Sequence, residues 1–292
     1  MKTINRIMTD AIDLHVHCAP DPFTERRLNA HQLALEAREA GMRAVVIKNH
    51  NYCTALLARQ VNEITDLPIL FGSIALNRSV GGLNADVVEA AAIAGAKIIW
   101  LPTLSSADEI RTHPPDKYGA PETLKKKNDS GIDLLNVDGS LVPEIAPILE
   151  VIKRYNLVLA TGHISIPEAI AVAKEALAKK IDVIITHPFA KPFAKSIEIE
   201  QAQELVSKGA IIEFCLLAMM PPMRITPAEV IRHIRTLGAE HCILSSDQGQ
   251  VFNPTPTEGF RMMIANMLRF GLTEKELEIL VKVNPGRLLK LI

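Results

Sequence analysis

Two histidines separated by a single residue lie in an apolar stretch near the N-terminus of the chain. They are His15 and His17 in the segment IDLHVH. On a β-strand, side chains two residues apart point to the same face, and neutral imidazole nitrogens are common ligands of zinc and similar divalent ions. The spacing therefore predicts that both imidazoles can bind one metal ion from the same side.

Five further polar residues stand at or just after the ends of other short apolar runs. They are, in chain order, Lys48, His50, His163, His187 and Asp247. A single buried histidine is most often a hydrogen-bonded core residue. That explanation is weak for a set of histidines and an aspartate that all stand at strand ends, provided that the fold brings these ends together.

The elements that would position these residues alternate regularly along the chain. Short apolar runs rich in β-branched residues alternate with segments that carry apolar residues at three- and four-residue intervals. Such an alternation predicts βαβ units and parallel strand pairing. The apolar runs are residues 11–17, 44–50, 68–77, 96–103, 157–163, 181–188, 210–218 and 241–247.

Eight such units predict an α/β fold, a TIM-like (β/α)8 barrel. An open doubly wound sheet is the alternative, but no GxGxxG motif follows the first run. In a parallel barrel the carboxyl ends of all strands gather at one mouth, where active sites lie. The barrel therefore predicts that the histidines, Lys48 and Asp247 converge.

One connection is much longer than the others. The fourth and fifth runs begin at Ala96 and Leu157, 61 residues apart, and the stretch of about 103–140 is charged and interrupted by proline and glycine. This composition predicts an irregular insertion rather than a separate domain. We expect residues 1–292 to form a single barrel domain, with a long insertion after strand four that lies over the mouth.

Composition and charge argue against several classes of protein. The 292 residues include 32 basic and 33 acidic side chains, and the net charge of −1 gives no support to nucleic-acid binding. Residues 1–10 lack the apolar core of a secretory signal, and no apolar run approaches the roughly 20 residues that span a bilayer. We expect a cytoplasmic protein with a small-molecule substrate and no membrane partner, and a homo-oligomer, as is common among enzymes.

The four cysteines have no CxxC spacing, so we expect reduced thiols. Two of them, Cys18 and Cys215, could lie near the site.

The order and spacing of the polar residues resemble the amidohydrolase superfamily of metal-dependent hydrolases. That pattern has HxH after strand one, a histidine after each of strands five and six, and an aspartate after strand eight. The corresponding residues here are His15, His17, His163, His187 and Asp247. The segment NPGRLLKLI near the C-terminus also resembles an ending common in that superfamily. The resemblance covers nearly the whole chain and indicates an uncharacterised branch.

The resemblance implies a role for each of these residues. His15 and His17 would bind the more buried metal ion. His163 and His187 would bind a second ion, or one of them would bind a single ion while the other polarises the substrate. Asp247 would contact the metal and accept a proton from the attacking water. The implied cofactor is one or two divalent ions, zinc by default, with manganese, iron or nickel as alternatives.

The chain departs from the superfamily pattern at strand four. Many members with two metal ions carry a lysine, often carbamylated, or a glutamate at the end of that strand to bridge the ions. Here the run AKIIWLPT has Lys97 at its start and ends in Trp100, Pro102 and Thr103, none of which is a good bridge.

Lys48 offers a substitute bridge, because strand alternation predicts that it faces inward near the mouth. Burial lowers the pKa of a lysine, and a neutral amine could combine with carbon dioxide to form a bridging carbamate. In the alternative, Lys48 stays cationic and pairs with Asp247 or with a substrate anion, with His50 beside it.

The leading functional hypothesis is hydrolysis of an amide, lactone or ester bond of a small molecule by metal-activated water. Asp247 would be the base, and His187 or Lys48 would stabilise the developing oxyanion. Phosphoester hydrolysis and metal-dependent decarboxylation are alternatives on the same barrel. A non-catalytic metal- or ligand-binding protein is an alternative of another class.

Four further residues are candidates for contact with the substrate. Arg78, in NRSVGGLN after the third run, suits a carboxylate or phosphate, and Lys191 after the sixth run could also neutralise phosphate. Glu213 shares a face with Cys215 and could position Lys48 or a substrate amine, or form a structural salt bridge. His50 stands beside Lys48 at the mouth.

Overall fold

The computed structural model describes residues 2–112, 130–190, 196–221, 223 and 225–292. Its strands form one parallel sheet in which the strands follow one another in sequence order, and this confirms the eight predicted strands. They are β1 (Ile12–Val16), β2 (Ala44–Ile47), β3 (Leu70–Ala75), β4 (Ala96–Trp100), β5 (Val158–Ala160), β6 (Asp182–Ile185), β7 (Ile211–Cys215) and β8 (Cys242–Ser245).

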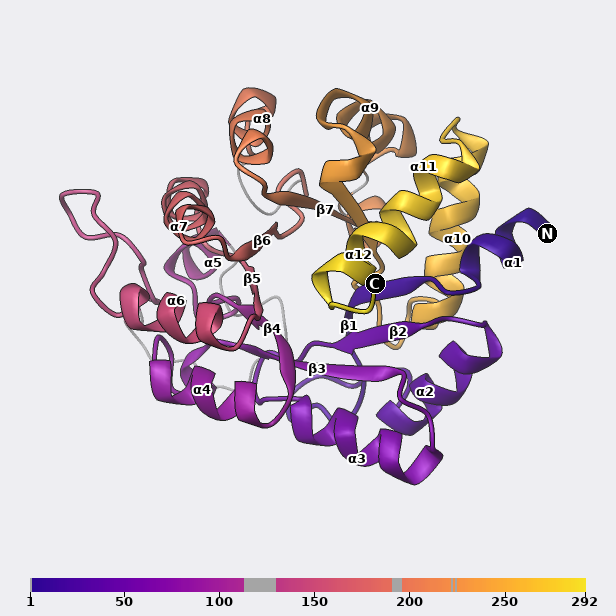
Figure 1. Ribbon diagram of the computed structural model, residues 1–292, viewed down its shortest axis with the longest axis horizontal. Helices are drawn as coiled ribbons and strands as arrows, with labels where there is room; N and C mark the ends of the chain where they lie inside the picture. Colours follow the sequence, from indigo (N-terminus) through magenta and orange to yellow (C-terminus); the bar gives the residue numbers. More distant parts are fainter. Residues whose placement is uncertain (1, 113–129, 191–195, 222, 224) are drawn as a thin grey trace.

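The first and last strands meet and complete a barrel. The backbone N–H of His17 donates to the carbonyl of Gln248 at 2.8 Å, and the N–H of Asp247 donates to the carbonyl of His15 at 2.8 Å. Figure 1 shows the strands at the centre with the helices outside them. The fold is therefore the predicted TIM-like (β/α)8 barrel.

Helices connect the strands and cover the outside of the barrel. They bury their apolar faces against it, as the three- and four-residue spacing predicts. None of the helices within the described ranges is both long enough and apolar enough to cross a membrane. The α-helices are α1 (Lys2–Met8), α2 (Ala30–Glu39), α3 (Ala55–Thr65), α4 (Ala85–Ile93), α5 (Ala107–Thr112), α6 (Ile145–Arg154), α7 (Ile166–Ala178), α8 (Ile199–Ser207), α9 (Pro227–Leu237), α10 (Pro256–Arg269), α11 (Glu274–Glu278) and α12 (Asn284–Leu288).

Short helical turns complete the described elements. Three are 3₁₀ turns, and the fourth, η6, is a turn of π-helix between α11 and α12. They are η1 (Arg78–Val80), η4 (Leu217–Met219), η5 (Ala239–His241) and η6 (Ile279–Val283).

The lumen of the barrel has its own apolar core, separate from the layer between strands and helices. A cluster of buried side chains from the strands fills it, including Ile12, Leu14 and Trp100. The C-terminal helix α12 contributes Leu288, and Leu289 follows it into the same cluster. The side chain of Asn284 donates to the carbonyl of Cys242 at 2.7 Å, at the start of β8. The segment NPGRLL therefore closes the end of the barrel opposite the mouth.

Strand β1 contains an irregularity that matters for the site. Its register against β2 shifts between Asp13 and Val16, and both Ile12 and Leu14 pack in the lumen. Strict alternation would then turn His15 outward. An irregularity of this kind re-aims the side chains that follow it, and the contacts of His15 described below are all with residues at the lumen.

The insertion after β4 is not wholly irregular, in contrast to our prediction. Helix α5 forms its first part, and Ser106 pairs with Ile132 in an isolated parallel bridge that ties the two described arms together. The backbone N–H of Leu134 donates to the carboxylate of Glu168 in α7 at 2.6 Å. Residues 113–129 lie outside the described ranges.

Candidate metal centre

Five histidines form a closed circuit at the mouth of the barrel, which we call the histidine circle. The centroid distances are 5.5 Å for His15–His17, 5.0 Å for His17–His50, 5.9 Å for His50–His163, 5.2 Å for His163–His187 and 6.1 Å for His187–His15. Residues from four strand ends, distant in sequence, thus converge as predicted.

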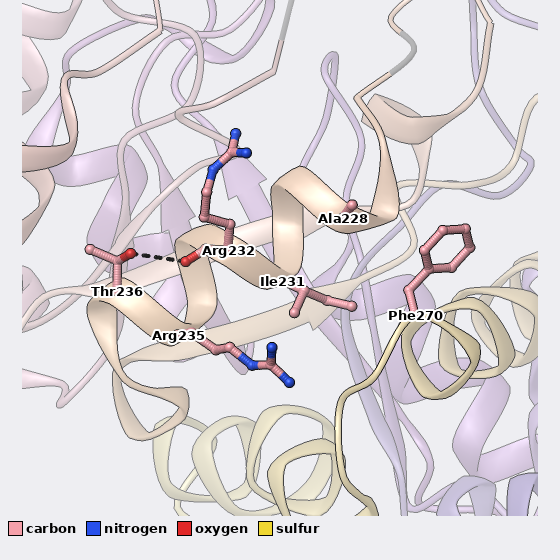
Figure 2. A pocket seen from close by; sticks show the side chains of 6 residues that line it. All are labelled: Ala228, Ile231, Arg232, Arg235, Thr236 and Phe270. Carbon is pink, nitrogen blue, oxygen red and sulfur yellow. Dashed lines mark hydrogen bonds between the residues drawn. The ribbon is translucent and has the colours of Figure 1, made fainter.

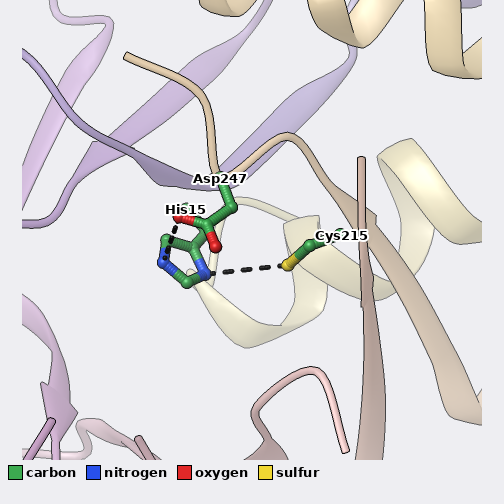
Figure 3. Close-up of side chains that lie close together, drawn as sticks. All are labelled: His15, Cys215 and Asp247. Atoms are coloured by element: carbon green, nitrogen blue, oxygen red, sulfur yellow. Dashed lines mark hydrogen bonds and ion pairs between the residues drawn. The ribbon is translucent and has the colours of Figure 1, made fainter. Parts of the chain in front are cut away.

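The side of the circle next to β8 has the tightest geometry. One carboxylate oxygen of Asp247 lies 3.1 Å from Nε2 of His15 and 3.1 Å from Nε2 of His17. The exposed fractions of these three residues are 0% for His15, 3% for His17 and 8% for Asp247. Figure 3 shows the Asp247 carboxylate beside the His15 imidazole. Two imidazole nitrogens and one carboxylate oxygen therefore lie within a small volume that water scarcely reaches.

The spacing of these atoms fits a metal site. Ligands of a tetrahedral zinc ion lie about 3.3 Å apart when each bond is about 2.0–2.1 Å long. The 3.1 Å separations from the Asp247 oxygen are close to that value. Two histidines and a carboxylate are also ligand types that divalent transition metals prefer.

Two further side chains contact His15. Both carboxylate oxygens of Glu213 lie 3.3 Å from Nδ1 of His15, and Nζ of Lys48 lies 3.0 Å from Nε2. Lys48 also stacks its ammonium over the Trp100 ring, 4.5 Å from the centroid. The prediction that Lys48 faces the lumen is confirmed. Glu213, whose direction the sequence left open, also contacts a histidine there.

The contact with Glu213 gives His15 the arrangement of a metal ligand. A ligating histidine usually donates its other ring N–H to a carboxylate, which fixes the tautomer and orients the ring. With Nδ1–H donated to Glu213, Nε2 is the atom of His15 that could bind a metal ion beside Asp247. Asp247 and Glu213 raise the pKa of His15 against the effect of burial, so binding of the ion would release the proton from Nε2. Glu213 is fully buried, so its contact with a substrate amine stays a prediction.

Cys215 is a neighbour whose role the sequence left open. Its thiol lies 3.8 Å from Nδ1 of His15, and His15, Cys215 and Asp247 offer ligand atoms that all lie within 4.8 Å of one another. Figure 3 shows the thiol approaching the imidazole from β7. Burial and the charge of Glu213 hold the pKa of the Cys215 thiol well above its usual value, so the thiol lies beside the site in its protonated form.

The charges of the β8 side follow from burial and close contact. Burial alone would raise the pKa of Asp247, but His15 and His17 hold it well below its usual value. Burial, reinforced by the charge of Arg26, lowers the pKa of His17 to about 3. An ionised carboxylate and a neutral imidazole are the forms that bind a metal.

The side of the circle formed by β5 and β6 is more open. His163 lies with Nδ1 3.3 Å from a carboxylate oxygen of Glu109, which α5 supplies from the insertion, and its side chain is 19% exposed. Burial and the neighbouring His163 lower the pKa of His187 to about 4. Glu109 could not be predicted from the sequence, because the insertion shows no strand pattern that would direct a side chain to the mouth.

His187 and Asp247 share an unusual backbone. Their φ angles are 28° and 52°, in the left-handed region that non-glycine residues adopt rarely and mostly when they are Asn, Asp or His. Such conformations gather at functional sites, where the surrounding structure holds them. At both positions the strand has ended, and the turn directs the side chain back over the lumen.

Gly249, next to this turn, occupies a position where no residue with a side chain fits. A Cβ at this position would lie 2.1 Å from the carbonyl oxygen of His17. The absence of a side chain lets the β8 turn pack against the backbone of the HxH segment, which brings Asp247 to the two imidazoles.

Lys48 and His50 also have shifted pKa values. Burial lowers the pKa of Lys48, although Asp247 and Glu213 oppose the shift. Burial and the charge of Lys48 lower the pKa of His50 well below its usual value. Nδ1 of His50 lies 2.8 Å from the hydroxyl of Thr103, a residue that the sequence offered only as a poor bridge.

Two predicted substrate residues are not brought to the circle by any described contact. The guanidinium of Arg78 donates to the carbonyl of Gly131 at 2.9 Å, and its backbone N–H donates to the Ser105 hydroxyl at 3.1 Å. Arg78 therefore links η1 to the insertion, and its contact with a substrate anion stays a prediction. Lys191 lies outside the described residues.

A hollow of about 430 Å³ lies elsewhere, on the outer surface of the barrel. Figure 2 shows it between α9 and the residue that follows α10. It contains none of the histidines or carboxylates of the mouth, so it is not the candidate metal centre. Its lining residues are Ala228, Ile231, Arg232, Arg235, Thr236 and Phe270.

The fold of the chain is similar to that of several solved structures. The chain is similar to an amidohydrolase from Pseudomonas aeruginosa, with a TM-score of 0.62, 11% identity and 98% of each chain covered. It is similar to a probable 2-pyrone-4,6-dicarboxylic acid hydrolase from Acinetobacter baumannii, with a TM-score of 0.60, 11% identity, and 97% of this chain and 100% of that chain covered. The predicted resemblance to amidohydrolases is confirmed at the level of the fold.

A third similar structure comes from work on organophosphate hydrolysis activity engineered from a weak promiscuous lactonase. Its TM-score is 0.56 and its identity 15%, with 97% of this chain and 96% of that chain covered. No protein with a curated description matches the chain. The model of a family of unknown function, DUF6282, matches residues 10–213. The chain belongs to this family.

Proposed function

We propose that the protein is a metal-dependent hydrolase that attacks an amide, lactone or ester bond of a small molecule. The observation that carries the proposal is the single Asp247 oxygen held 3.1 Å from the Nε2 atoms of both His15 and His17. Two imidazole nitrogens and a carboxylate oxygen gathered in a buried site are ligand types that a divalent ion binds, and the ion in our proposal is zinc.

The residues at the mouth would have separate roles in hydrolysis: metal binding, proton transfer and stabilisation of the oxyanion. A divalent ion at His15, His17 and Asp247 would supply Lewis acidity, which acidifies water and polarises a carbonyl oxygen. Asp247, ionised at neutral pH, accepts the proton of the attacking water and passes it to the leaving group. His187 is neutral at that pH, so its ring N–H can donate to the developing oxyanion.

Lys48 decides how many ions the site holds. As a cation, it stabilises an anionic substrate or the oxyanion, and the site holds one ion. As a carbamate, it would supply a further ligand, and a second ion would be held by His163 and His187. Metal content of Lys48→Met in the presence of bicarbonate separates the two: loss of a second ion with the first retained supports the bridge, and unchanged stoichiometry eliminates it.

The test of function is a hydrolysis panel on zinc-reconstituted protein. We expect turnover of at least one lactone, ester or amide, abolition by chelator, restoration by zinc, and loss of kcat in Asp247→Asn. Metal-loaded protein inactive on all three classes contradicts the proposal. Release of carbon dioxide from a carboxylated substrate, with no hydrolysis, would replace it with the decarboxylase alternative.

Phosphoester hydrolysis is a second candidate. The similarity in fold to the lactonase engineered toward organophosphate hydrolysis favours it, because the same ligand set suits both carbonyl and phosphoryl oxygens. A phosphotriester and a phosphomonoester in the panel distinguish it: turnover of either, with lactones untouched, would make it the leading function.

A further inference from the structure

The buried side chain of Asn77 has a fixed amide orientation. Its Oδ1 accepts from the backbone N–H groups of Thr103 at 2.8 Å and Ser105 at 3.0 Å. Its Nδ2 donates to the carbonyl of His50 at 2.8 Å and to the hydroxyl oxygen of Thr103 at 2.7 Å. The reverse orientation would set the amide N–H groups against two backbone N–H donors, so Nδ2 must be the atom that faces Thr103.

This orientation determines the role of the Thr103 hydroxyl. Thr103 is fully buried, and a buried hydroxyl proton without an acceptor is costly. The oxygen already accepts from Asn77. Among the described residues, side chain or backbone, the one other hydrogen-bond partner of this oxygen is Nδ1 of His50, at 2.8 Å. The Thr103 hydroxyl therefore donates to Nδ1 of His50.

His50 must then be neutral, with its proton on Nε2. A proton on Nδ1, in either the other tautomer or the imidazolium ion, would leave the Thr103 hydroxyl without an acceptor. His50 is partly exposed at the mouth. Within the described part of the chain, Nε2 of His50 has no hydrogen-bond partner. The ring lies at 26° to that of His17, with the centroids 5.0 Å apart, and Nδ1 of His17 has no hydrogen-bond partner among the described residues.

His15 shows the opposite arrangement. A carboxylate, which can only accept, faces its Nδ1 and leaves a lone pair on Nε2 for a metal. A hydroxyl that donates faces Nδ1 of His50 and leaves an N–H on Nε2. The partner of Nδ1 thus determines what Nε2 offers: a metal-binding lone pair in His15 and an N–H donor in His50.

We infer that His50 is not a metal ligand but a neutral hydrogen-bond donor, whose Nε2–H faces an oxygen acceptor of the substrate, a carbonyl or carboxylate. Asn77 and Thr103 are its positioning residues. The substrate-facing part rests on the proposed function, whereas the tautomer rests only on the Asn77–Thr103–His50 contacts.

The tautomer can be read by NMR of protein labelled with ¹⁵N-histidine, with His50 assigned by comparison with His50→Gln. We expect a proton on Nε2 and none on Nδ1 near neutral pH, unchanged when zinc is added. Thr103→Val should abolish the single tautomer, and Thr103→Ser should restore it. A proton on Nδ1, or loss of the Nε2 proton on zinc binding, would overturn the inference.

Acetate serves as the probe for the substrate-facing part, since it is a minimal oxygen acceptor. In zinc-loaded protein, acetate should shift the Nε2–H resonance of His50 in the wild type and Thr103→Ser; no shift in the wild type would overturn that part. Zinc uptake is measured on the same samples. Failure to take up zinc would contradict the proposed function and leave the tautomer in the metal-free protein as a separate result.

Discussion

The two sides of the histidine circle differ in how completely the chain has organised them. On the β1/β8 side, formed by His15, His17 and Asp247, the ligand atoms are already in contact and almost fully buried. On the β5/β6 side, formed by His163 and His187, the rings lie 5.2 Å apart between centroids, and His163 contacts a glutamate from the insertion.

The difference follows from what holds each side. Backbone hydrogen bonds between β1 and the β8 turn fix the first, and Glu213 orients His15 from behind. The second depends on a left-handed turn at His187 and on the insertion. We interpret the β1/β8 side as a preformed metal site and the β5/β6 side as the part that adapts to substrate or to a second ion.

The largest effect should come from removal of a ligand on the preformed side. His17→Ala should weaken zinc binding by more than about 100-fold, because loss of a direct ligand exceeds the 10–100-fold cost typical of its outer partners. Competition with a chromophoric chelator measures the affinity. His31→Ala, an exposed histidine in α2, is the matched control, and equal affinities for the two variants would contradict the assignment.

Removal of the Glu213 charge, next to Nδ1 of His15, should lower zinc affinity less than removal of a ligand does. Glu213→Gln keeps the size of the side chain and an oxygen that can accept from Nδ1, so we expect zinc affinity to fall by roughly 10–100-fold without unfolding. Glu258→Gln, on the exposed face of α10, controls for loss of one negative charge. If Glu213 has only a structural role, thermal stability will fall while zinc affinity stays at the wild-type value.

Asp13 lies at the contact between β1 and the β8 turn, and its titration predicts a pH-dependent stability. One oxygen accepts from the backbone N–H groups of His15 and Ser246, and burial raises the pKa of this carboxyl from 3.8 to about 7. The folded protein therefore holds this proton more tightly than the unfolded chain. The free energy of unfolding therefore falls as the pH rises from 3.8 to about 7. Above about pH 7 Asp13 is ionised in both states, and the full cost of its buried charge is present.

Asp13→Asn should remove that cost, because the amide oxygen can accept the same two hydrogen bonds. In chelator, we expect the variant to gain about 2–3 kcal/mol over the wild type between pH 5 and pH 8, because each pKa unit corresponds to about 1.4 kcal/mol, measured by urea unfolding at each pH. Asp10→Asn, an exposed position, should show no such gain. A difference between Asp13→Asn and wild type that is constant with pH would rule out the titration.

The smallest effect on zinc affinity should come from a substitution on the β5/β6 side. His163→Asn should leave the affinity for the first zinc ion within about threefold of the wild type, since effects at separate sites are nearly independent. Calorimetric titration with zinc measures this. A collapse of affinity as large as that of His17→Ala would show that the two sides are one site and would remove the distinction between them.

The fold and the convergence of the polar residues could be predicted from the sequence because both depend on periodic patterns. The alternation of apolar runs with helical segments specifies the barrel, and the barrel fixes where every strand ends. His15, His17, Lys48 and Asp247 could therefore be brought together without knowledge of any loop.

Residues that act from loops or across irregular backbone could not be found in this way. Glu109 reaches His163 from a helix inside the insertion, and Asn77 and Thr103 meet only because the loops after β3 and β4 are neighbours. No periodicity connects such residues. The register shift in β1 is a similar case, because a local irregularity has no signature in the run IDLHVH.

The metal content per chain tests the account most directly. Protein purified without chelator or affinity tag, and its His17→Ala variant, would be analysed by elemental mass spectrometry before and after reconstitution with zinc. We expect at least one divalent ion per chain in the wild type and a loss of that ion in the variant. No bound metal in the wild type after reconstitution would contradict the account and leave the contact of Asp247 with two imidazoles without its proposed cause.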